Sequence, residues 1–262
     1  MSKRQPISQN RDSTWADIYD RVYAYLTEDI FFYVEQAVAS GGPVLELGCG
    51  TGRVGVPVAQ AGMSVVGIDV SPSLIKVARS KARTAGVSDH CIFRFGDMRE
   101  IRLAQSFPLV IMPFRSFQDM LSIAEQQATL NLVRRHLTPR GRLVFDIWAP
   151  DVHTLADDGT APSHFRDVSD STTGHTLSLW HQNGWDHQHQ INNARLIVDE
   201  MDADGVLIHR LHHSFQMRYS FRYEMQHLLT TCGFRVLEVY GGFQRQDPDE
   251  DSEDMVWVVE AT

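Results

Sequence analysis

The sequence has few cysteines, no long apolar run and a deficit of positive charge. Its three cysteines, Cys49, Cys91 and Cys232, are widely spaced and odd in number, which argues against a disulfide framework or a zinc knuckle. No run of about 18 apolar residues occurs, and the polar segment 1–10 lacks the apolar core of a secretory signal. We therefore expect a cytoplasmic protein that is neither secreted nor membrane-spanning.

Basic residues are outnumbered, because 24 Lys and Arg stand against 33 Asp and Glu, for a formal net charge of -9. Such a chain repels a phosphate backbone, so nucleic acid is not expected as a partner. The acidic run 247–254 is interpreted as a solvated loop, with an acidic gate for a cationic substrate as the alternative. The length of 262 residues suits one α/β domain with an insertion.

Short apolar runs alternate with helical patterns between residues 43 and 150, which is typical of βαβ units on a parallel sheet. The expected strands are 44–47, 64–69, 91–95, 109–112 and 142–148. Local signals place the helix ends: Ser71 and Pro72 as an N-terminal cap, Ser122 and Glu125 as a capping box, and Gly86 and Gly141 as terminators. Pro57 predicts a short or bent helix after the glycine-rich loop.

The pattern changes between residues 151 and 220, where His, Gln, Asn and Thr become frequent. Extended segments are expected at 177–180, 194–198 and 206–209, with the turn 202–205 joining the last two as a hairpin. A helix at 223–231 and strands at 235–240 and 255–260 follow. We therefore divide the chain into a helical lid (1–42), a core (43–150), an inserted antiparallel β cover (151–220) and a C-terminal return to the core (221–262).

A strand ending at Glu46, glycines at 48, 50 and 52, and a following helix allow backbone to approach a ligand at a helix N-terminus. Asp69 ends the next strand, where a carboxylate can accept from both hydroxyls of a ribose. The spacing Gly50-x-Gly52-x-x-Gly55 also fits a dinucleotide fingerprint, which keeps a nicotinamide or flavin enzyme in consideration. The register argues against it, because Gly50 lies two residues beyond Gly48 instead of directly after the strand.

Residues 44–52, Val-Leu-Glu-Leu-Gly-Cys-Gly-Thr-Gly, resemble the first motif of class I methyltransferases, and 67–72 and 95–98 resemble the next two. The resemblance implies an α/β, Rossmann-like seven-stranded and mostly parallel sheet with a small antiparallel cover, and S-adenosylmethionine as cofactor. Asp97 would accept from the adenine amine and Met98 would pack on the ring. Pro108 departs from the family, which usually has an acidic residue there. The implied cofactor-binding residues are Glu46, Gly48, Cys49, Gly50, Gly52, Arg53, Asp69, Val70, Asp97, Met98 and Pro113.

The family resemblance places segment 113–119 beside the reacting end of the cofactor. Asp119 and Tyr19 are the candidate catalytic residues, the first as an anchor or base for an ammonium and the second on a lid over the donor. Both residues also have a purely structural interpretation. Asp119 would then be a carboxylate that stabilises the start of a helix, and Tyr19 would belong to an aromatic stripe that only packs. Tyr23, Arg115 and Trp180 are the candidate substrate-binding residues.

The sequence thus predicts a methyltransferase for a small molecule, with an amine nitrogen favoured over oxygen or carbon. A nicotinamide oxidoreductase and a non-catalytic protein that only binds the cofactor are the rival functions. The histidines of 181–213 lack the cysteine or carboxylate spacing of a metal site, so no metal is predicted. A homodimer is left open.

Overall fold

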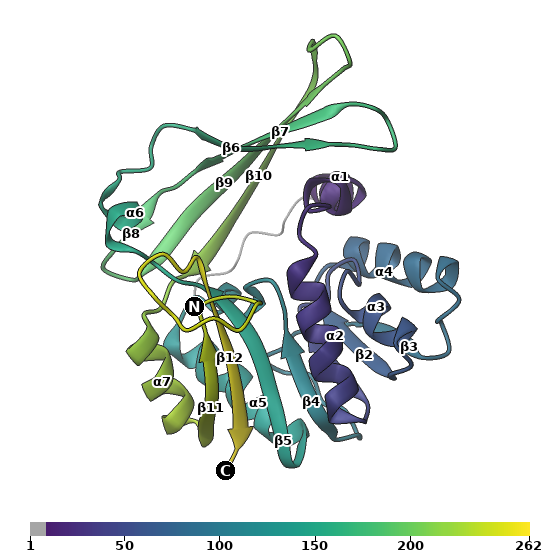
Figure 1. The fold of residues 1–262 in the computed structure, drawn as a ribbon, viewed down its shortest axis with the longest axis vertical. Coiled ribbons are helices and arrows are strands. Elements are labelled where there is room, and N and C mark those ends of the chain that lie inside the picture. Colours follow the sequence, from purple (N-terminus) through teal and green to yellow (C-terminus); the bar gives the residue numbers. More distant parts are fainter. Residues whose placement is uncertain (1–8) are drawn as a thin grey trace.

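The computed structural model describes residues 9–262, and side chains from Thr14 onward. Residues 1–8, the start of the predicted lid, lie outside the described residues. The described chain forms a layered α/β core with a second, antiparallel sheet standing above it (Figure 1).

The core is a seven-stranded sheet with the spatial order β11-β12-β5-β4-β1-β2-β3. Strands β1 to β5 are mutually parallel, whereas β12 runs antiparallel to both β5 and β11. The strand order reverses between β1 and β4, which creates a ligand crevice at the carboxyl ends of the strands. The bounds are β1 Val44–Leu47, β2 Val65–Asp69, β3 Cys91–Phe95, β4 Phe107–Met112, β5 Leu137–Trp148, β11 Phe234–Tyr240 and β12 Asp254–Ala261.

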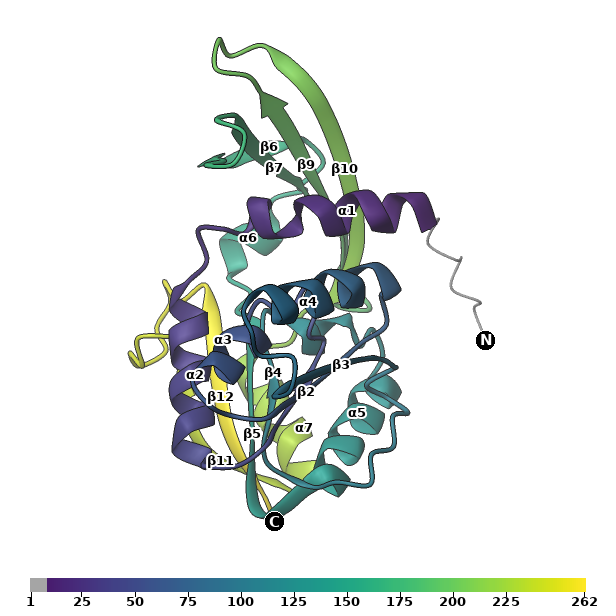
Figure 2. The same ribbon diagram turned by 90° about the vertical axis from the view of Figure 1, so that its right-hand side faces the viewer.

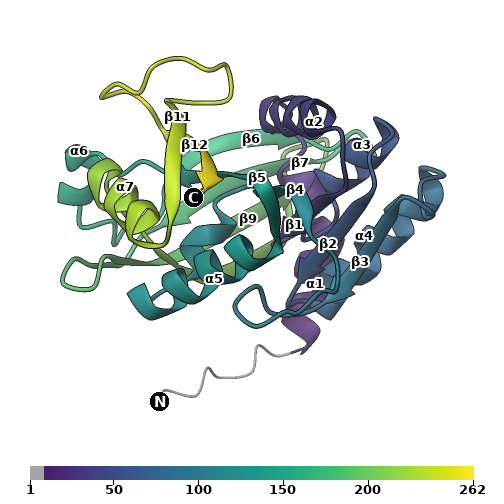
Figure 3. The ribbon, with the colours of Figure 1, turned by 90° about the horizontal axis from the view of Figure 1, so that it is seen from below.

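Helices cover both faces of this sheet, as seen from below in Figure 3. One face packs against α5 (Ile123–His136) and α7 (Arg222–Thr231). The other packs against α2 (Glu28–Ser40), α3 (Gly55–Gln60) and α4 (Pro72–Thr84). Both predicted caps are confirmed: Leu74 N donates to Ser71 Oγ at 3.2 Å, and Ser122 and Glu125 form a capping box. Helix α3 has six residues, which confirms the effect predicted for Pro57.

The inserted cover is a five-stranded antiparallel sheet whose main path is β10-β9-β7-β6, with β8 paired to β9. It lies beyond the carboxyl ends of the core strands (Figure 1). A short helix, α6, leads into it, and Asp202 accepts from Val206 N at the hairpin turn that joins β9 to β10. The bounds are α6 Val152–Ala156, β6 Ser163–Ser169, β7 Thr176–Gln182, β8 Trp185–Asp186, β9 Ile191–Met201 and β10 Leu207–Arg218.

Helix α1 (Gln9–Val22) lies between the cover and α4 (Figure 2). Trp15 and Val22 join a cluster with Leu177 and Leu179 of the cover, and the Trp15 ring stacks on His213 with ring centroids 4.0 Å apart. Arg21 forms ion pairs with Asp170 and Glu200, each at 2.7 Å. These contacts attach the helix to the inner face of the cover.

The fold class is confirmed, with differences at element ends. Helix α5 ends at His136, and Gly141 does not terminate it: Leu137 already pairs with Phe107 of β4, so Gly141 lies inside an irregular stretch of β5. Strands β6 and β8 and helix α6 were not predicted, and β9 (11 residues) and β10 (12 residues) are about two and three times as long as expected. Their polar residues hide the alternation that marks a half-buried strand.

Candidate active site

The glycine-rich loop follows β1 and brings three left-handed residues together, since φ is +72° at Gly48, +53° at Gly50 and +72° at Gly52. A Cβ on Gly48 would lie 2.5 Å from Ser116 Oγ, and one on Gly52 would lie 2.8 Å from the Phe93 ring. A Cβ on Gly50 would meet nothing within 4 Å. The loop is therefore closed by packing at its two ends and open at its middle glycine.

Glu46 lies beneath this loop at 2% relative exposure. Its Oε2 is buried without a hydrogen-bond partner among the described residues, and it lies 2.3 Å from where a Cβ on Gly55 would be. Burial raises the pKa of Glu46 to about 8, and the positive charge of Arg53 opposes that rise. A buried carboxylate with an unsatisfied oxygen is what a cationic ligand above it would stabilise.

Asp69 is the last residue of β2 and binds the backbone of the same loop. Its carboxylate accepts from Gly50 N and from Ser71 N, each at 2.8 Å. The neighbouring Val70 is 56% exposed. Asp69 thus fixes both the middle of the glycine loop and the start of α4, because each carboxylate oxygen takes one backbone donor.

Asp97 and Met98 follow β3 on the same edge of the sheet. The Asp97 carboxylate accepts from Arg99 N at 2.8 Å and pairs with the Arg99 guanidinium, which also pairs with Glu125. Met98 is buried, and its Cε lies 3.5 Å from where a Cβ on Gly48 would be. The structure therefore brings the predicted adenine-side residues next to the glycine loop.

Cys49 is buried within the loop, and its backbone continues the pairing with β2, since Gly48 N and Cys49 N both donate to Ile68 O. Burial, together with the charge of Glu46, raises the pKa of the Cys49 thiol well above its ordinary value. This side chain is therefore a packing group and no thiolate nucleophile.

Helix α1 and the segment after it are attached directly to the glycine loop. Asp20 accepts from Thr51 Oγ1 at 2.7 Å and forms an ion pair with Lys81 at 2.9 Å. Arg53 makes a bidentate ion pair with Asp29 of α2, at 2.9 and 2.5 Å, and its guanidinium lies 5.1 Å from the centroid of the Phe114 ring. The cofactor loop is thus held from above by the N-terminal segment.

The turn after β4 has an unusual backbone. Phe114 and Arg115 both have positive φ, 55° and 61°, directly after the buried Pro113. Phe114 N and Arg115 N donate to the two oxygens of Asp146, each at 2.8 Å, and Asp146 also accepts from Tyr33 Oη at 2.6 Å. Non-glycine residues hold such angles only where their surroundings enforce them.

The aromatic side chains of the lid meet this turn. Tyr19 and Tyr23 of the N-terminal segment pack edge-on against Phe114, with ring centroids 6.4 and 4.7 Å apart. Burial raises the pKa of Tyr19 well above its ordinary value, and Tyr23 adds to the rise. Tyr19 therefore keeps its proton at neutral pH and can act as a hydrogen-bond donor, not as a phenolate base.

Asp119 and Arg115 lie at opposite ends of this segment. Asp119 ends the short 3-10 helix η1 (Ser116–Asp119) and is exposed. The Arg115 side chain forms an ion pair with Asp254 at the start of β12, with Nε and Oδ1 2.8 Å apart. Arg115 was predicted to contact the substrate, and in the structure its guanidinium is paired with this partly exposed carboxylate.

Trp180 lies on β7 between Leu179 and His181, so its side chain points to the face opposite Leu179, which packs against α1. Trp185 instead pairs with Asn192 on the inner face and stacks on Trp148 of β5, with ring centroids 5.8 Å apart. Alternation therefore directs Trp185, and not Trp180, toward the core.

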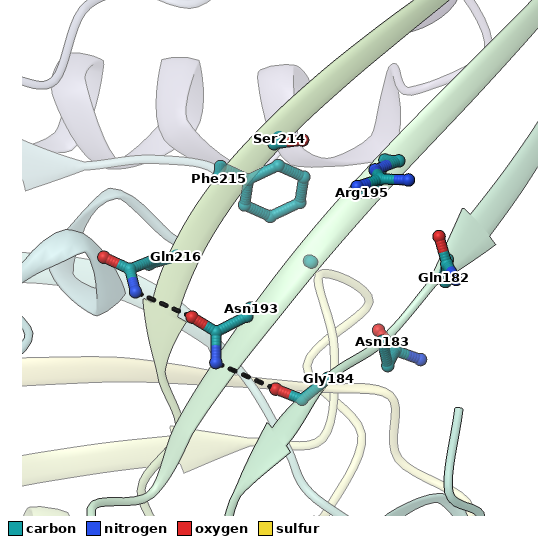
Figure 4. A pocket seen from close by; sticks show the side chains of 9 residues that line it. Gln182, Asn183, Gly184, Asn193, Arg195, Ser214, Phe215 and Gln216 are labelled. Atoms are coloured by element: carbon teal, nitrogen blue, oxygen red, sulfur yellow. Dashed lines mark hydrogen bonds between the residues drawn. The ribbon is translucent and has the colours of Figure 1, made fainter. Parts of the chain in front are cut away.

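A hollow of about 390 Å³ lies on the cover, where Gln216 donates to Asn193 Oδ1 and Asn193 donates to Gly184 O (Figure 4). None of the residues predicted to bind the cofactor or the substrate lines it. Within residues 9–262 no group of three or more His, Cys, Asp and Glu side chains is arranged to hold a metal ion. No helix in this described part is long and apolar enough to span a membrane.

Several residues of the site were not singled out from the sequence. They are Asp20, Asp29, Asp146 and Asp254, while Phe114 and Ser116 were named only as members of segment 113–119. Asp146 had a usable signal, because it is the one carboxylate within the apolar run 143–148 of β5. The others carry no local pattern, since their partners lie elsewhere in the chain.

Comparison with known proteins agrees with this geometry. Residues 44–141 match the family described as methyltransferase domain. The chain is an S-adenosylmethionine-dependent methyltransferase with a Rossmann-like fold. S-adenosylmethionine is accordingly its methyl donor, and the predictions of enzyme class and cofactor are confirmed.

The methyltransferase is 26% identical over 243 residues to the putative methyltransferase YqeM of Bacillus subtilis (strain 168), covering 91% of this chain and 92% of that protein. It is 24% identical over 211 residues to a dTDP-3-amino-3,4,6-trideoxy-alpha-D-glucopyranose N,N-dimethyltransferase of Streptomyces venezuelae, covering 64% of this chain and 84% of that one. The CcbJ methyltransferase from Streptomyces caelestis has the same fold, with a TM-score of 0.78, 24% identity and coverage of 98% and 100%.

Replacing Asp20 by Asn in the methyltransferase is expected to weaken binding of S-adenosylhomocysteine by about threefold to tenfold. The change removes a partly exposed ion pair to Lys81 and weakens the bond from Thr51, and each such contact contributes on the order of 1 kcal/mol. Titration calorimetry measures the effect, with Asp17→Asn one turn earlier on α1 as the matched control. Equal affinities for the two variants would contradict the attachment of α1 to the loop.

Proposed function

We propose that the enzyme methylates a small molecule at an amine nitrogen. A small substrate is inferred from the enclosure of the glycine loop by α1. This helix is bonded to the loop through Asp20 and to the cover through Arg21. A macromolecular acceptor would have to displace these contacts.

The preference for nitrogen rests on charge and on similar proteins. The chain is acidic overall, and Asp119 offers an exposed carboxylate next to the turn after β4. Proteins described as aminosugar N,N-dimethyltransferases are among those with similar sequences, and an amino pentose methyltransferase from Micromonospora echinaspora has the same fold at a TM-score of 0.73. A substrate ammonium is attracted to such a carboxylate and can lose its proton to it.

In this proposal the residues of the glycine loop would hold the cofactor together with the carboxylates around it. Asp69 would bind the ribose and Asp97 the adenine amine, Met98 would pack on the adenine ring, and Glu46 would supply a carboxylate for the cationic part of the cofactor. The fit is supported by the unsatisfied Glu46 Oε2 and by the open side of Gly50. The bound cofactor supplies a sulfonium methyl group as the electrophile.

The chain itself then has three tasks: to align the acceptor, to exclude water and to receive a proton. Tyr19, Tyr23 and Phe114 form a largely buried aromatic wall between the lid and the turn. In this proposal Trp185, on the inner face of the cover, lines the substrate pocket, and Trp180 on the opposite face does not. Arg115, paired with Asp254, lies beside this wall. Asp119 binds the substrate ammonium or accepts its proton.

The proposal is tested by incubating the enzyme with methyl-labelled S-adenosylmethionine and panels of small amines, phenols and carboxylates. Mass spectrometry of the products locates the label. Label on nitrogen of an amine supports the proposal, and label only on oxygen or carbon acceptors overturns the preference for nitrogen. The Asp69→Ala variant serves as the negative control for enzyme-dependent labelling.

Replacing Tyr19 by Phe is expected to lower kcat about tenfold on the acceptor found in that panel, with little change in melting temperature. The ring would still pack against Trp15, Tyr23 and Phe114, whereas the loss of one hydrogen bond in the transition state costs on the order of 1 to 2 kcal/mol. Steady-state kinetics measures the effect, and Tyr223→Phe, at an exposed site on α7, is the control. An unchanged kcat would reduce Tyr19 to a packing residue.

A further inference from the structure

We infer that Asp146 is a positioning residue of the methyl-transfer site, whose ionised carboxylate holds the Phe114–Arg115 turn in its strained form and thereby keeps the lid packed over the cofactor loop. The inference concerns the site itself and is independent of the acceptor class.

The first support is the match between the carboxylate and its donors. Two successive left-handed residues point their N–H groups to the same side, and such a pair forms a small concave site for an anion. Phe114 N donates to Oδ1 and Arg115 N to Oδ2, both at 2.8 Å. Each carboxylate oxygen accepts from one of these backbone N–H groups. With asparagine at position 146, the side-chain NH₂ would therefore face a backbone N–H, and two donors would meet without an acceptor.

The second support is what the turn carries. The Phe114 ring packs edge-on against Tyr23 and Tyr19 and lies under the Arg53 guanidinium. Arg53 belongs to the segment that follows the glycine loop and is paired with Asp29. A turn that relaxed to negative φ would move the Phe114 ring, and both the lid and the Arg53 contact depend on that ring.

The third support is the environment of Asp146, which is 2% exposed. Tyr33 and Asp29 face it from α2, Asp254 from β12, and Arg115 and Arg53 from the turn and the loop. Burial, followed by the charge of Asp254, raises the pKa of Asp146 to about 7, while Tyr33 and Arg115 oppose the rise. The carboxylate thus takes up a proton as the pH falls through neutrality, and the turn then loses its anion.

Affinity for S-adenosylhomocysteine, measured by calorimetry between pH 6 and pH 8.5, tests this inference. We expect the wild-type affinity to fall roughly tenfold as the pH drops through about 7, because charge-assisted hydrogen bonds are about twice as strong as neutral ones. Asp146→Asn is expected to bind roughly tenfold more weakly at pH 8 and to lose this acid-side fall. Any pH dependence due to Glu46 is common to both proteins and cancels in their ratio.

Amide hydrogen exchange provides a readout that needs no ligand. The amides of Phe114 and Arg115 are expected to exchange at least about tenfold faster in Asp146→Asn than in the wild type, and also faster at pH 6 than the intrinsic rate change accounts for. The exposed hairpin variant Asp204→Asn should behave as wild type. If Asp146→Asn does not fold, Tyr33→Phe, which removes only the hydroxyl donor, should shift the acid-side fall to higher pH. A wild-type pH profile and unchanged exchange in the folded variant would overturn the inference.

Discussion

Replacement of Asp69 by Ala is expected to weaken binding of S-adenosylhomocysteine by at least about a hundredfold and to abolish measurable methyl transfer. The carboxylate accepts from Gly50 N and Ser71 N, so its removal leaves two backbone donors of the cofactor loop without their anion. Hydrogen bonds to a charged group contribute roughly 1.5 to 3 kcal/mol each, and the proposed bonds from the ribose are lost as well.

Calorimetry with S-adenosylhomocysteine measures this loss, and circular dichroism confirms that the variant is folded. The exposed Asp89, which lies between α4 and β3, offers the matched control Asp89→Ala. An affinity within about threefold of wild type would show that Asp69 only shapes the loop and does not contact the cofactor.

Replacement of Gly50 by Ala is expected to block the cofactor while leaving the protein folded. At φ +53° an alanine costs roughly 1 kcal/mol of stability, and its methyl group would enter the open side of the loop. Since that is the side on which the backbone is proposed to approach the cofactor, we expect the affinity for S-adenosylhomocysteine to fall at least about thirtyfold.

Gly41 provides a control of nearly the same local strain. It has φ +64° at the C-terminal end of α2, and a Cβ there also meets nothing within 4 Å. Gly41→Ala should therefore lose a similar amount of stability in urea unfolding but bind S-adenosylhomocysteine as wild type does. Equal loss of affinity in both variants would trace the effect to general destabilisation instead of to the cofactor site.

Local sequence signals were sufficient where each residue interacts with near neighbours in the chain. Glu46, the three glycines and Asp69 lie within 24 residues of one another, and their spacing reflects one strand, one tight loop and the next strand. The helix caps at Ser71 and Ser122 are likewise decided within one turn of helix. These features could be predicted because their geometry is set by backbone rules that act over a few residues.

In the cover, local sequence signals were not sufficient to predict the strand bounds or the direction of the side chains. Leu177 and Leu179 alternate with polar residues and were recognised as a strand, but β10 is mostly exposed and rich in His, so its 12 residues gave a weak pattern. The face to which Trp180 points depends on which side of β7 meets α1, and that helix ends more than 150 residues earlier in the sequence, at Val22. No periodicity within the strand itself determines which of its two faces is the inner one.

The sequence by itself determined the class I fold, the methyltransferase activity and the cofactor, because a glycine loop between two strands needs particular residues at particular spacings. Tertiary structure alone decided how the site is closed. Asp20 meets Thr51, Asp29 meets Arg53, and Asp146 meets the backbone of Phe114 and Arg115 only after the sheet and α2 have packed. The energy of a buried carboxylate depends on donors brought from distant segments, and these distances exist only in the folded chain.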